Sequence, residues 1–225
     1  MINTASIANI PFMELREGLD KLVKGGTKFF HIDLMDGHYV PNLCFPIGII
    51  RELKDAYPQI YMDVHVMVTE PINYIERLKM AGADYVCFHT DSTSFVRRTI
   101  NEIHRAEMKA GIVINPSQLI EHIRPYAKYV DMVMVMAVEP GFSGQPFLEG
   151  TMERIEELTE LRQECGNPFL ISVDGGVDRE KCIGCQKLGV DMIVGTRHNI
   201  FYQPEGILEA CRRFEIEFGE GKVIR

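Results

Sequence analysis

The sequence has few basic residues for its length, and this limits the partners it can bind. Lys and Arg total 24 against 32 Asp and Glu, which leaves a formal net charge of −8. Nucleic acids and anionic membrane surfaces are bound by clustered Lys and Arg, and the sequence contains no such cluster. We therefore expect a small-molecule ligand, with neither nucleic acid nor membrane as a partner.

Long apolar runs and a secretion signal are also missing. No apolar run reaches the roughly 20 residues that span a bilayer, and the first residues lack the basic, apolar and small-residue layout of a signal peptide. We expect a cytoplasmic protein with reduced thiols. No linker-like segment interrupts the chain, and 46% hydrophobic content in 225 residues can bury one sizeable core. The prediction is one domain, residues 1–225.

Paired cysteines are scarce, since only Cys182 and Cys185 of the six form a C-x-x-C motif. A structural zinc site would need a second pair or nearby histidines, and a redox pair would need a strand just before it. The segment DREKCIGCQKLG has neither. Because the two thiols lie one helical turn apart, we interpret them as apolar contacts on a helix face.

What the chain does contain is a regular alternation of strand-like and helix-like segments. Apolar runs alternate with amphipathic stretches such as INYIERLKMAG and MERIEELTELRQE. Eight such units in about 220 residues predict a closed (β/α)₈ TIM barrel of the α/β class, since open doubly wound sheets usually have about five to seven strands. The predicted strands span residues 3–6, 28–34, 60–68, 84–90, 109–115, 131–138, 169–174 and 191–195.

Polar residues gather at the carboxyl ends of these predicted strands. One falls at or just past the end of each strand: Ser6, Asp33, His65, His89, Asn115, Glu139, Asp174 and Gly195. Active sites of TIM barrels lie on the face where the strands end. We therefore expect one ring of residues to form one site.

Two neighbouring strands carry titratable side chains on one face. Because a strand alternates its faces, His31 and Asp33 share one side of FFHIDLM, and Asp63 and His65 share one side of DVHVM. If these strands line the barrel mouth, His31, Asp33 and His65 converge with Asp174 as ligands for Zn²⁺, Mn²⁺, Fe²⁺ or Co²⁺. The spacing alone leaves open that each is an ordinary hydrogen-bonded structural residue.

Three glycine-bearing turns follow the last three predicted strands: EPGFSGQPF, DGGV and VGTRHNIF. Barrels commonly bind phosphate with the loops after strands seven and eight, through backbone amides that no side chain covers. The pattern favours a phosphorylated substrate, although glycines that only close tight turns would give the same pattern. The residues predicted to form this end of the site are Gly141, Phe142, Ser143, Gly144, Gly175, Gly176, Gly195 and Thr196.

Five motifs, in order and across most of the chain, resemble those of the ribulose-phosphate 3-epimerase family: HIDLMDGHYVPN, DVHVMV, INPSQ, VMAVEPGFSGQPF and VDGGV. The resemblance implies a phosphate-binding (β/α)₈ barrel that interconverts D-ribulose 5-phosphate and D-xylulose 5-phosphate. It also implies one divalent metal ion per chain, with Zn²⁺ as the first choice and Fe²⁺, Mn²⁺ or Co²⁺ as alternatives. Members of the family are often homo-oligomers, so we expect a dimer or larger.

The resemblance also implies roles for individual residues. The metal ligands that it implies are His31, Asp33, His65 and Asp174. The residues that it places against the substrate are Ser6, His65, Met35, Met67 and Met136. Asp33 and Asp174 become the acid/base pair, because inverting C3 removes a proton beside a carbonyl and returns one to the opposite face through an enediolate. Two carboxylates whose pKa values are pushed apart suit this task.

Departures from the family pattern leave the substrate open. Ser143 stands in place of a glycine, and Arg197 stands where the family usually has a small residue. Together with GQPF and VGT, these departures resemble the D-allulose 6-phosphate 3-epimerase branch, which is the alternative substrate. We predict that Arg197 contacts the substrate phosphate, and the alternative is that it points outward into solvent or a neighbouring subunit.

Two further alternatives come from other classes of protein. A non-catalytic sugar-phosphate binding protein would keep the barrel and the glycine turns, but the intact ligand set argues against it. Decarboxylases on similar barrels rely on a Lys near an Asp-x-Lys strand end, and the corresponding strand here reads HIDLMD. Metal analysis together with an epimerase assay separates these alternatives.

Overall fold

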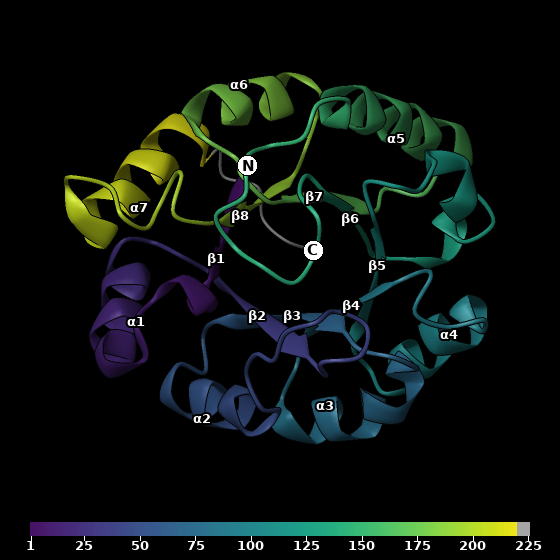
Figure 1. The fold of residues 1–225 in the computed structure, drawn as a ribbon, viewed down its shortest axis with the longest axis horizontal. Coiled ribbons are helices and arrows are strands. Elements are labelled where there is room, and N and C mark those ends of the chain that lie inside the picture. Colours follow the sequence, from purple (N-terminus) through teal and green to yellow (C-terminus); the bar gives the residue numbers. More distant parts are fainter. Residues whose placement is uncertain (220–225) are drawn as a thin grey trace.

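The computed structural model describes residues 1–219, and eight parallel strands in this range close into a barrel (Figure 1). The strands are β1 (Ile2–Ser6), β2 (Phe29–Met35), β3 (Tyr61–Met67), β4 (Tyr85–His89), β5 (Lys109–Ile114), β6 (Met132–Met136), β7 (Leu170–Asp174) and β8 (Met192–Gly195). Each strand pairs with the next, and β8 pairs with β1 to close the sheet. The predicted (β/α)₈ barrel is confirmed, and every predicted strand end lies within two residues of the observed one.

Seven α-helices of the described range form a ring outside the strands (Figure 1). They are α1 (Leu15–Lys24), α2 (Gly48–Ala56), α3 (Ile75–Ala81), α4 (Val96–Arg105), α5 (Thr151–Cys165), α6 (Arg179–Lys187) and α7 (Gly206–Phe218). None of these helices has the length and apolar character needed to cross a membrane.

The connection between β5 and β6 differs from the prediction of eight strand–helix units. It contains two short 3₁₀ turns, η4 (Ile120–Ile123) and η5 (Ala127–Tyr129), where an α-helix was expected. Pro125 lies between them, and proline both lacks the backbone N–H that a helix needs and clashes with the preceding turn. The helical pattern therefore cannot continue through this segment.

The alternation along the strands separates two buried apolar regions. Ile32 and Leu34 of β2 pack in the layer between strands and helices, whereas Phe29 packs in the barrel interior. His31 and Asp33 share the face of Phe29, because side chains two residues apart point to the same side. Methionine and aromatic side chains fill the interior, among them Tyr85, Met132, Met134 and Met192. The interior is a packed core, so only its carboxyl end remains for a site.

The C-x-x-C pair is part of a helix face, as interpreted from the sequence. Cys182 and Cys185 lie on α6 and are fully buried against the layer outside the strands. Asp178 caps this helix, because its carboxylate accepts a hydrogen bond from the Lys181 N–H at 2.8 Å. All six cysteines lie in the described range and are free thiols.

Candidate active site

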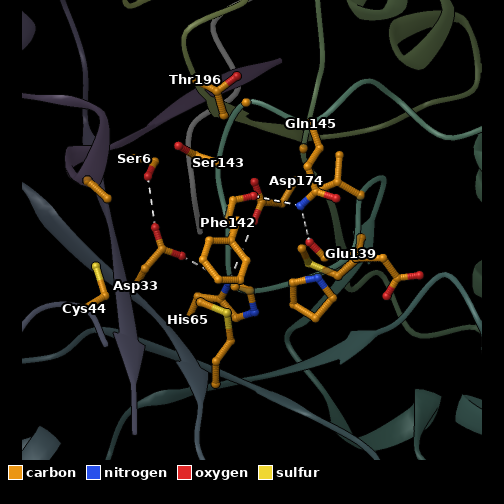
Figure 2. A pocket seen from close by; sticks show the side chains of 18 of the residues that line it. Ser6, Asp33, Cys44, His65, Glu139, Phe142, Ser143, Gln145, Asp174 and Thr196 are labelled. Atoms are coloured by element: carbon orange, nitrogen blue, oxygen red, sulfur yellow. Dashed lines mark hydrogen bonds and ion pairs between the residues drawn. The ribbon is translucent and has the colours of Figure 1, made fainter. Parts of the chain in front are cut away.

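A cavity of about 190 Å³ opens where the strands end, at the carboxyl face of the barrel (Figure 2). Its lining comes from β1, β2, β3, β6 and β7, from the loops that follow them and from the loop after β8. The predicted site residues that line it are Ser6, Asp33, Met35, His65, Met67, Met136, Gly141, Phe142, Ser143, Gly144, Asp174, Gly175, Gly176 and Thr196. Closure of the barrel thus brings together segments from both ends of the chain.

Several predicted residues lie outside this lining. His31 is fully buried next to the cavity, and Arg197 packs against Gly144 at the cavity rim. The expectation that every strand end contributes to one site is wrong for His89 and Asn115. His89 lies behind His65, and Asn115 hydrogen-bonds to loop residues instead. Among residues 1–219, β4 and β5 therefore contribute nothing to the cavity wall.

Two histidines and two aspartates converge at one end of the cavity, and their ligand atoms all lie within 4.8 Å of one another. Asp33 Oδ1 is 3.4 Å from both His31 Nε2 and His65 Nδ1. Asp174 Oδ2 is 3.9 and 3.7 Å from the same two nitrogens. Both nitrogens are buried, and neither has a hydrogen-bonding partner in the described chain. Since buried nitrogens are rarely left unpaired, this donor set is suited to a divalent cation.

Each of the two imidazoles is held by a buried partner. His31 Nδ1 donates to the fully buried Asp63 carboxylate at 2.8 Å, and His65 Nε2 lies 2.8 Å from His89 Nε2. Burial alone would lower the pKa of His31, but the Asp63 and Asp33 carboxylates raise it well above its ordinary value. Burial and the neighbouring His65 hold the pKa of His89 well below its ordinary value. These contacts orient the rings toward the two carboxylates.

The two carboxylates differ in their environments. Burial alone would raise the pKa of Asp33, but His31 and His65 outweigh it and hold that pKa far below its usual value. Burial raises the pKa of Asp174, and the Asp33 charge adds to this against the opposing effect of His31. Asp33 also accepts a hydrogen bond from the Ser6 hydroxyl at 3.0 Å. One carboxylate is thus held ionised while the other takes up a proton more readily, as an acid/base pair requires.

Glycine-rich loops form the opposite end of the cavity. Gly175 and Gly176 have φ angles of 110° and 62°. A Cβ added to them would lie 2.4 Å from Val138 Cγ2 and 2.6 Å from the Phe147 backbone nitrogen. Both positions therefore require glycine. At Gly195, just outside the lining, a Cβ would also be too close to its neighbours. The backbone thus approaches the cavity without side chains, as anion-binding turns do.

Two hydroxyl groups belong to this glycine-rich end. Figure 2 shows Ser143 and Thr196 at the end of the pocket away from Asp33 and His65. The prediction of a free Thr196 amide is wrong, because that N–H donates to Asn199 Oδ1 at 2.8 Å. The Thr196 hydroxyl is available instead, since Oγ1 is buried and has no hydrogen-bonding partner within residues 1–219. Loop contacts of this kind leave no periodic pattern in a sequence.

Arg197 covers the rim of the cavity. Its side chain is exposed, and its Cζ lies 5.3 Å from the centre of the Tyr202 ring. A Cβ on Gly144 would lie only 3.0 Å from Arg197 Nη1, so the guanidinium packs directly on this glycine of the lining. The sequence left two positions open for Arg197: a contact with the substrate phosphate, or an outward projection into solvent or a neighbouring subunit. The observed position lies between these two.

Three of the lining residues that were not predicted come from loops: Asn42, Cys44 and Gln145. Asn42 Nδ2 donates to the Gly141 carbonyl at 2.8 Å and so connects the loop after β2 to the loop after β6. Gln145 donates to two carbonyls of its own loop. Burial and the Asp33 charge raise the pKa of the Cys44 thiol to about 11. Asn42 belongs to the motif HIDLMDGHYVPN and Gln145 to VMAVEPGFSGQPF, so these motifs could have identified both residues. No motif or pattern in the sequence pointed to Cys44.

Fold and site together define a class of protein: a TIM barrel with a metal-competent His/Asp group on its carboxyl face, beside a glycine-rich end suited to an anion. A family model described as the ribulose-phosphate 3 epimerase family matches residues 2–201. The chain belongs to this family, which comprises isomerases that act on sugar phosphates.

Curated relatives agree with this membership. The chain is 36% identical over 189 residues to a ribulose-phosphate 3-epimerase from Treponema pallidum, covering 84% of this chain and 86% of the relative. It is 35% identical over 196 residues to the enzyme of that name from Bacillus subtilis, covering 86% and 90%.

Among solved structures, a 3-hexulose-6-phosphate synthase from Salmonella typhimurium aligns with a TM-score of 0.70 at 16% identity, covering 96% of this chain and 97% of that chain. An orotidine 5'-phosphate decarboxylase from Pyrococcus horikoshii aligns with a TM-score of 0.68 at 16% identity, covering 97% and 100%. At such low identity these two structures share the fold alone.

Proposed function

We propose that the chain interconverts D-ribulose 5-phosphate and D-xylulose 5-phosphate by inverting the configuration at C3. One observation carries the proposal: His31, Asp33, His65 and Asp174 converge at the mouth of a barrel that belongs to the epimerase family. The reaction removes the C3 proton beside the ketone and returns a proton to the opposite face of that carbon.

Asp33 and Asp174 form the acid/base pair in this proposal. Asp33, with its lowered pKa, takes the C3 proton from one face, and Asp174, with its raised pKa, donates a proton to the other. In the reverse direction the two carboxylates exchange roles. The Ser6 hydroxyl holds Asp33 Oδ2, which leaves Oδ1 directed toward the histidines. We expect each carboxylate to serve one face of the sugar.

His31, Asp33, His65 and Asp174 together would hold one divalent metal ion. Two imidazole nitrogens and two carboxylates suit Zn²⁺, our first choice, and also Fe²⁺, Mn²⁺ or Co²⁺. The buried nitrogens that lack partners in the described chain support this fit. When bound, the ion supplies positive charge that stabilises negative charge developing on the substrate oxygens.

Three methionines shield the reacting carbons in this proposal. Met35, Met67 and Met136 line the cavity, and Met67 and Met136 are almost completely buried. Their thioether side chains are apolar and polarisable, so they exclude water without competing for the carboxylates. We expect them to protect the deprotonated substrate from stray protons.

The glycine-rich end binds the substrate phosphate in this proposal. Backbone at Gly175 and Gly176 can approach an anion closely, and the Thr196 and Ser143 hydroxyls add hydrogen-bond donors. Arg197 at the rim adds a positive charge next to Gly144. We expect the phosphate to lie away from the carboxylates and C3 of the sugar to lie between Asp33 and Asp174.

The alternatives raised by the sequence have less support. The curated relatives described above are named ribulose-phosphate 3-epimerase, so the six-carbon substrate is not favoured. A binding protein without turnover has less support, because the family comprises isomerases and all four proposed ligands are present. Homo-oligomerisation, as a dimer or larger, and the absence of nucleic-acid binding stay predictions. Light scattering on the purified protein measures the first of these.

A side-by-side assay tests the proposal. Metal-free protein is loaded with Zn²⁺ and given D-ribulose 5-phosphate or D-allulose 6-phosphate in separate reactions. We expect inversion of the five-carbon sugar with a kcat/KM at least about tenfold higher than that for the six-carbon sugar, equivalent to ~1.4 kcal/mol of discrimination. A preference for the six-carbon sugar would reassign the substrate. Turnover of neither sugar, with Zn²⁺ or with Fe²⁺, Mn²⁺ or Co²⁺ in its place, would reject epimerase function.

A further inference from the structure

The two imidazoles of the proposed metal site have different partners. His31 donates to the Asp63 carboxylate, whereas His65 Nε2 faces Nε2 of another imidazole, His89, at 2.8 Å. The His65 and His89 rings lie 5.0 Å apart between centroids, with an angle of 28° between their planes. A contact this short between two nitrogens needs one proton, so one ring donates and the other accepts.

The atom that faces the carboxylates decides which ring donates. His65 Nδ1 lies 3.4 Å from Asp33 and 3.7 Å from Asp174, and a metal ligand must have a free lone pair at that atom. A neutral imidazole with a free Nδ1 carries its proton on Nε2. His65 therefore has to donate to His89, and His89 has to present an unprotonated Nε2 and carry its own proton on Nδ1.

The Asn115 side chain is held by hydrogen bonds to two other residues. Its Nδ2 donates to Asp91 Oδ2 at 2.9 Å and to Tyr39 Oη at 2.7 Å, and Tyr39 donates to the other oxygen of Asp91 at 2.7 Å. An ionised carboxylate only accepts, so the Asn115 amide cannot flip. His89 Nδ1 and Asn115 Oδ1 are both buried, and neither has a hydrogen-bonding partner among the described residues.

A loop residue closes over this arrangement. The Tyr39 ring, from the loop after β2, packs on the His89 ring with centroids 4.7 Å apart. His89 is fully buried and lies outside the cavity lining. It can therefore act on the reaction only through His65.

We propose that His89 is a positioning residue that holds His65 in the tautomer whose Nδ1 is free to bind a divalent cation. The His65 Nε2 proton then points toward His89 and away from the metal site. The proposal rests on the proposed metal site, and it adds the group that prepares one ligand of that site. His65 is then ready for the cation before the cation arrives.

Two substitutions separate hydrogen bonding from shape. In His89→Gln, the side-chain oxygen can still accept a bond from His65, whereas His89→Leu fills similar space without an acceptor. We expect His89→Leu to weaken Zn²⁺ binding by about 10- to 100-fold, the usual cost of losing an outer-shell partner. We expect His89→Gln to stay within about threefold of wild type on the same scale. Competition with a chromogenic chelator measures the affinity in each protein.

A control variant and an unfolding measurement complete this test. Met192→Leu changes a buried side chain of the barrel interior on β8, four strands from the β4 strand of His89, while conserving volume, so its Zn²⁺ affinity should match wild type. Equal loss of affinity in His89→Leu and His89→Gln, with unchanged unfolding temperatures, would show that His89 only fills space. Unchanged affinity in His89→Leu would also overturn the proposal.

A spectroscopic measurement needs no variant at all. In ¹⁵N-labelled, Zn²⁺-loaded wild-type protein, histidine ring spectra should place the proton of His65 on Nε2 and that of His89 on Nδ1. A proton on His89 Nε2 would overturn the inference while leaving the metal site intact. Failure of the wild-type protein to bind Zn²⁺, Fe²⁺, Mn²⁺ or Co²⁺ would instead reject the proposed metal site itself, so the two failures are distinguishable.

Discussion

The two ends of the cavity are built differently. The carboxylate end, made of His31, Asp33, His65 and Asp174, consists of side chains on three strands, and both aspartates are only 13–14% exposed. The glycine end consists of backbone in the loops after β6, β7 and β8: its members are Gly141, Ser143, Gly144, Gly175, Gly176 and Thr196. The function of the carboxylate end depends on which side chains are present. The function of the glycine end depends mainly on the absence of side chains at its glycines.

This difference has a consequence for catalysis. Groups that move protons must keep fixed positions, and a closed sheet holds strand residues more rigidly than loops do. A phosphate that is bound alike in the ground and transition states needs only donors that reach it, which loops can supply. Substitutions at the carboxylate end should therefore change metal content and kcat, and those at the glycine end should change KM.

The largest effect is expected from removing the metal or a ligand. Chelation should abolish activity, and one divalent ion per chain should restore it. His65→Ala should lower Zn²⁺ affinity by at least about 10²-fold, beyond the usual cost of losing an outer-shell partner. Metal content per chain after dialysis measures this. The exposed His122 of η4 offers a matched control, because His122→Ala should keep one ion. Full activity of the metal-free protein would contradict the assignment.

The next effect concerns the acid/base pair. Asp33→Asn and Asp174→Asn should each lower kcat at least ~10²-fold, the scale for losing a positioned acid or base. Steady-state kinetics on variants whose metal occupancy has been measured separate this loss from simple loss of the ion. Near-wild-type kcat in either fully loaded variant would remove that residue from the pair.

A smaller effect is expected at the glycine end. Gly176→Ala places a Cβ at a φ of 62° and 2.6 Å from the Phe147 backbone, which should displace the loop after β6. Strain of about 1–3 kcal/mol should raise KM roughly 5- to 150-fold, with metal content unchanged. Gly166→Ala is the matched control, since its φ is 66° and no described atom lies within 4 Å of the added Cβ. A lower kcat or a lower metal content in Gly176→Ala would contradict the separate roles of the two ends.

The smallest effect is expected at the rim. Arg197→Ala should raise KM for phosphorylated ketoses by a factor equivalent to about 1–3 kcal/mol, with the exposed position favouring the lower value. The kcat should change little, because the phosphate is bound alike before and during the reaction. Arg212→Ala, whose partner Glu209 lies on the same helix α7, serves as a control. Unchanged kcat/KM would leave the phosphate to the backbone and hydroxyl groups.

Strand residues could be predicted from the sequence because a strand repeats every two residues. The same alternation that places Ile32 in the outer layer places His31 and Asp33 inside, and closure of the barrel brings Asp174 to them. Periodicity therefore locates the carboxylate end. Periodicity also explains why the predicted bounds of all eight strands lie close to the observed bounds.

Loop contacts could not be predicted in this way. The amide of Thr196 is taken by Asn199, and Cys44 reaches the cavity along a loop whose path no periodic pattern describes. Pro125 overrides the helical pattern before β6. His89 points inward as its strand predicts, but His65 stands between it and the cavity. How deep an inward-pointing side chain lies in the barrel depends on the stagger between neighbouring strands. The alternation of residues along one strand does not determine this stagger.

The most direct test of the carboxylate pair is exchange of the C3 proton with deuterated water in metal-loaded Asp33→Asn and Asp174→Asn. If each carboxylate serves one face, each variant should exchange the C3 proton of one epimer only, without inversion, and the two variants should prefer opposite epimers. Nuclear magnetic resonance of D-ribulose 5-phosphate and D-xylulose 5-phosphate, each incubated separately, measures this. Exchange of the same epimer by both variants, or wild-type incorporation at C3 in both, would contradict the two-carboxylate account.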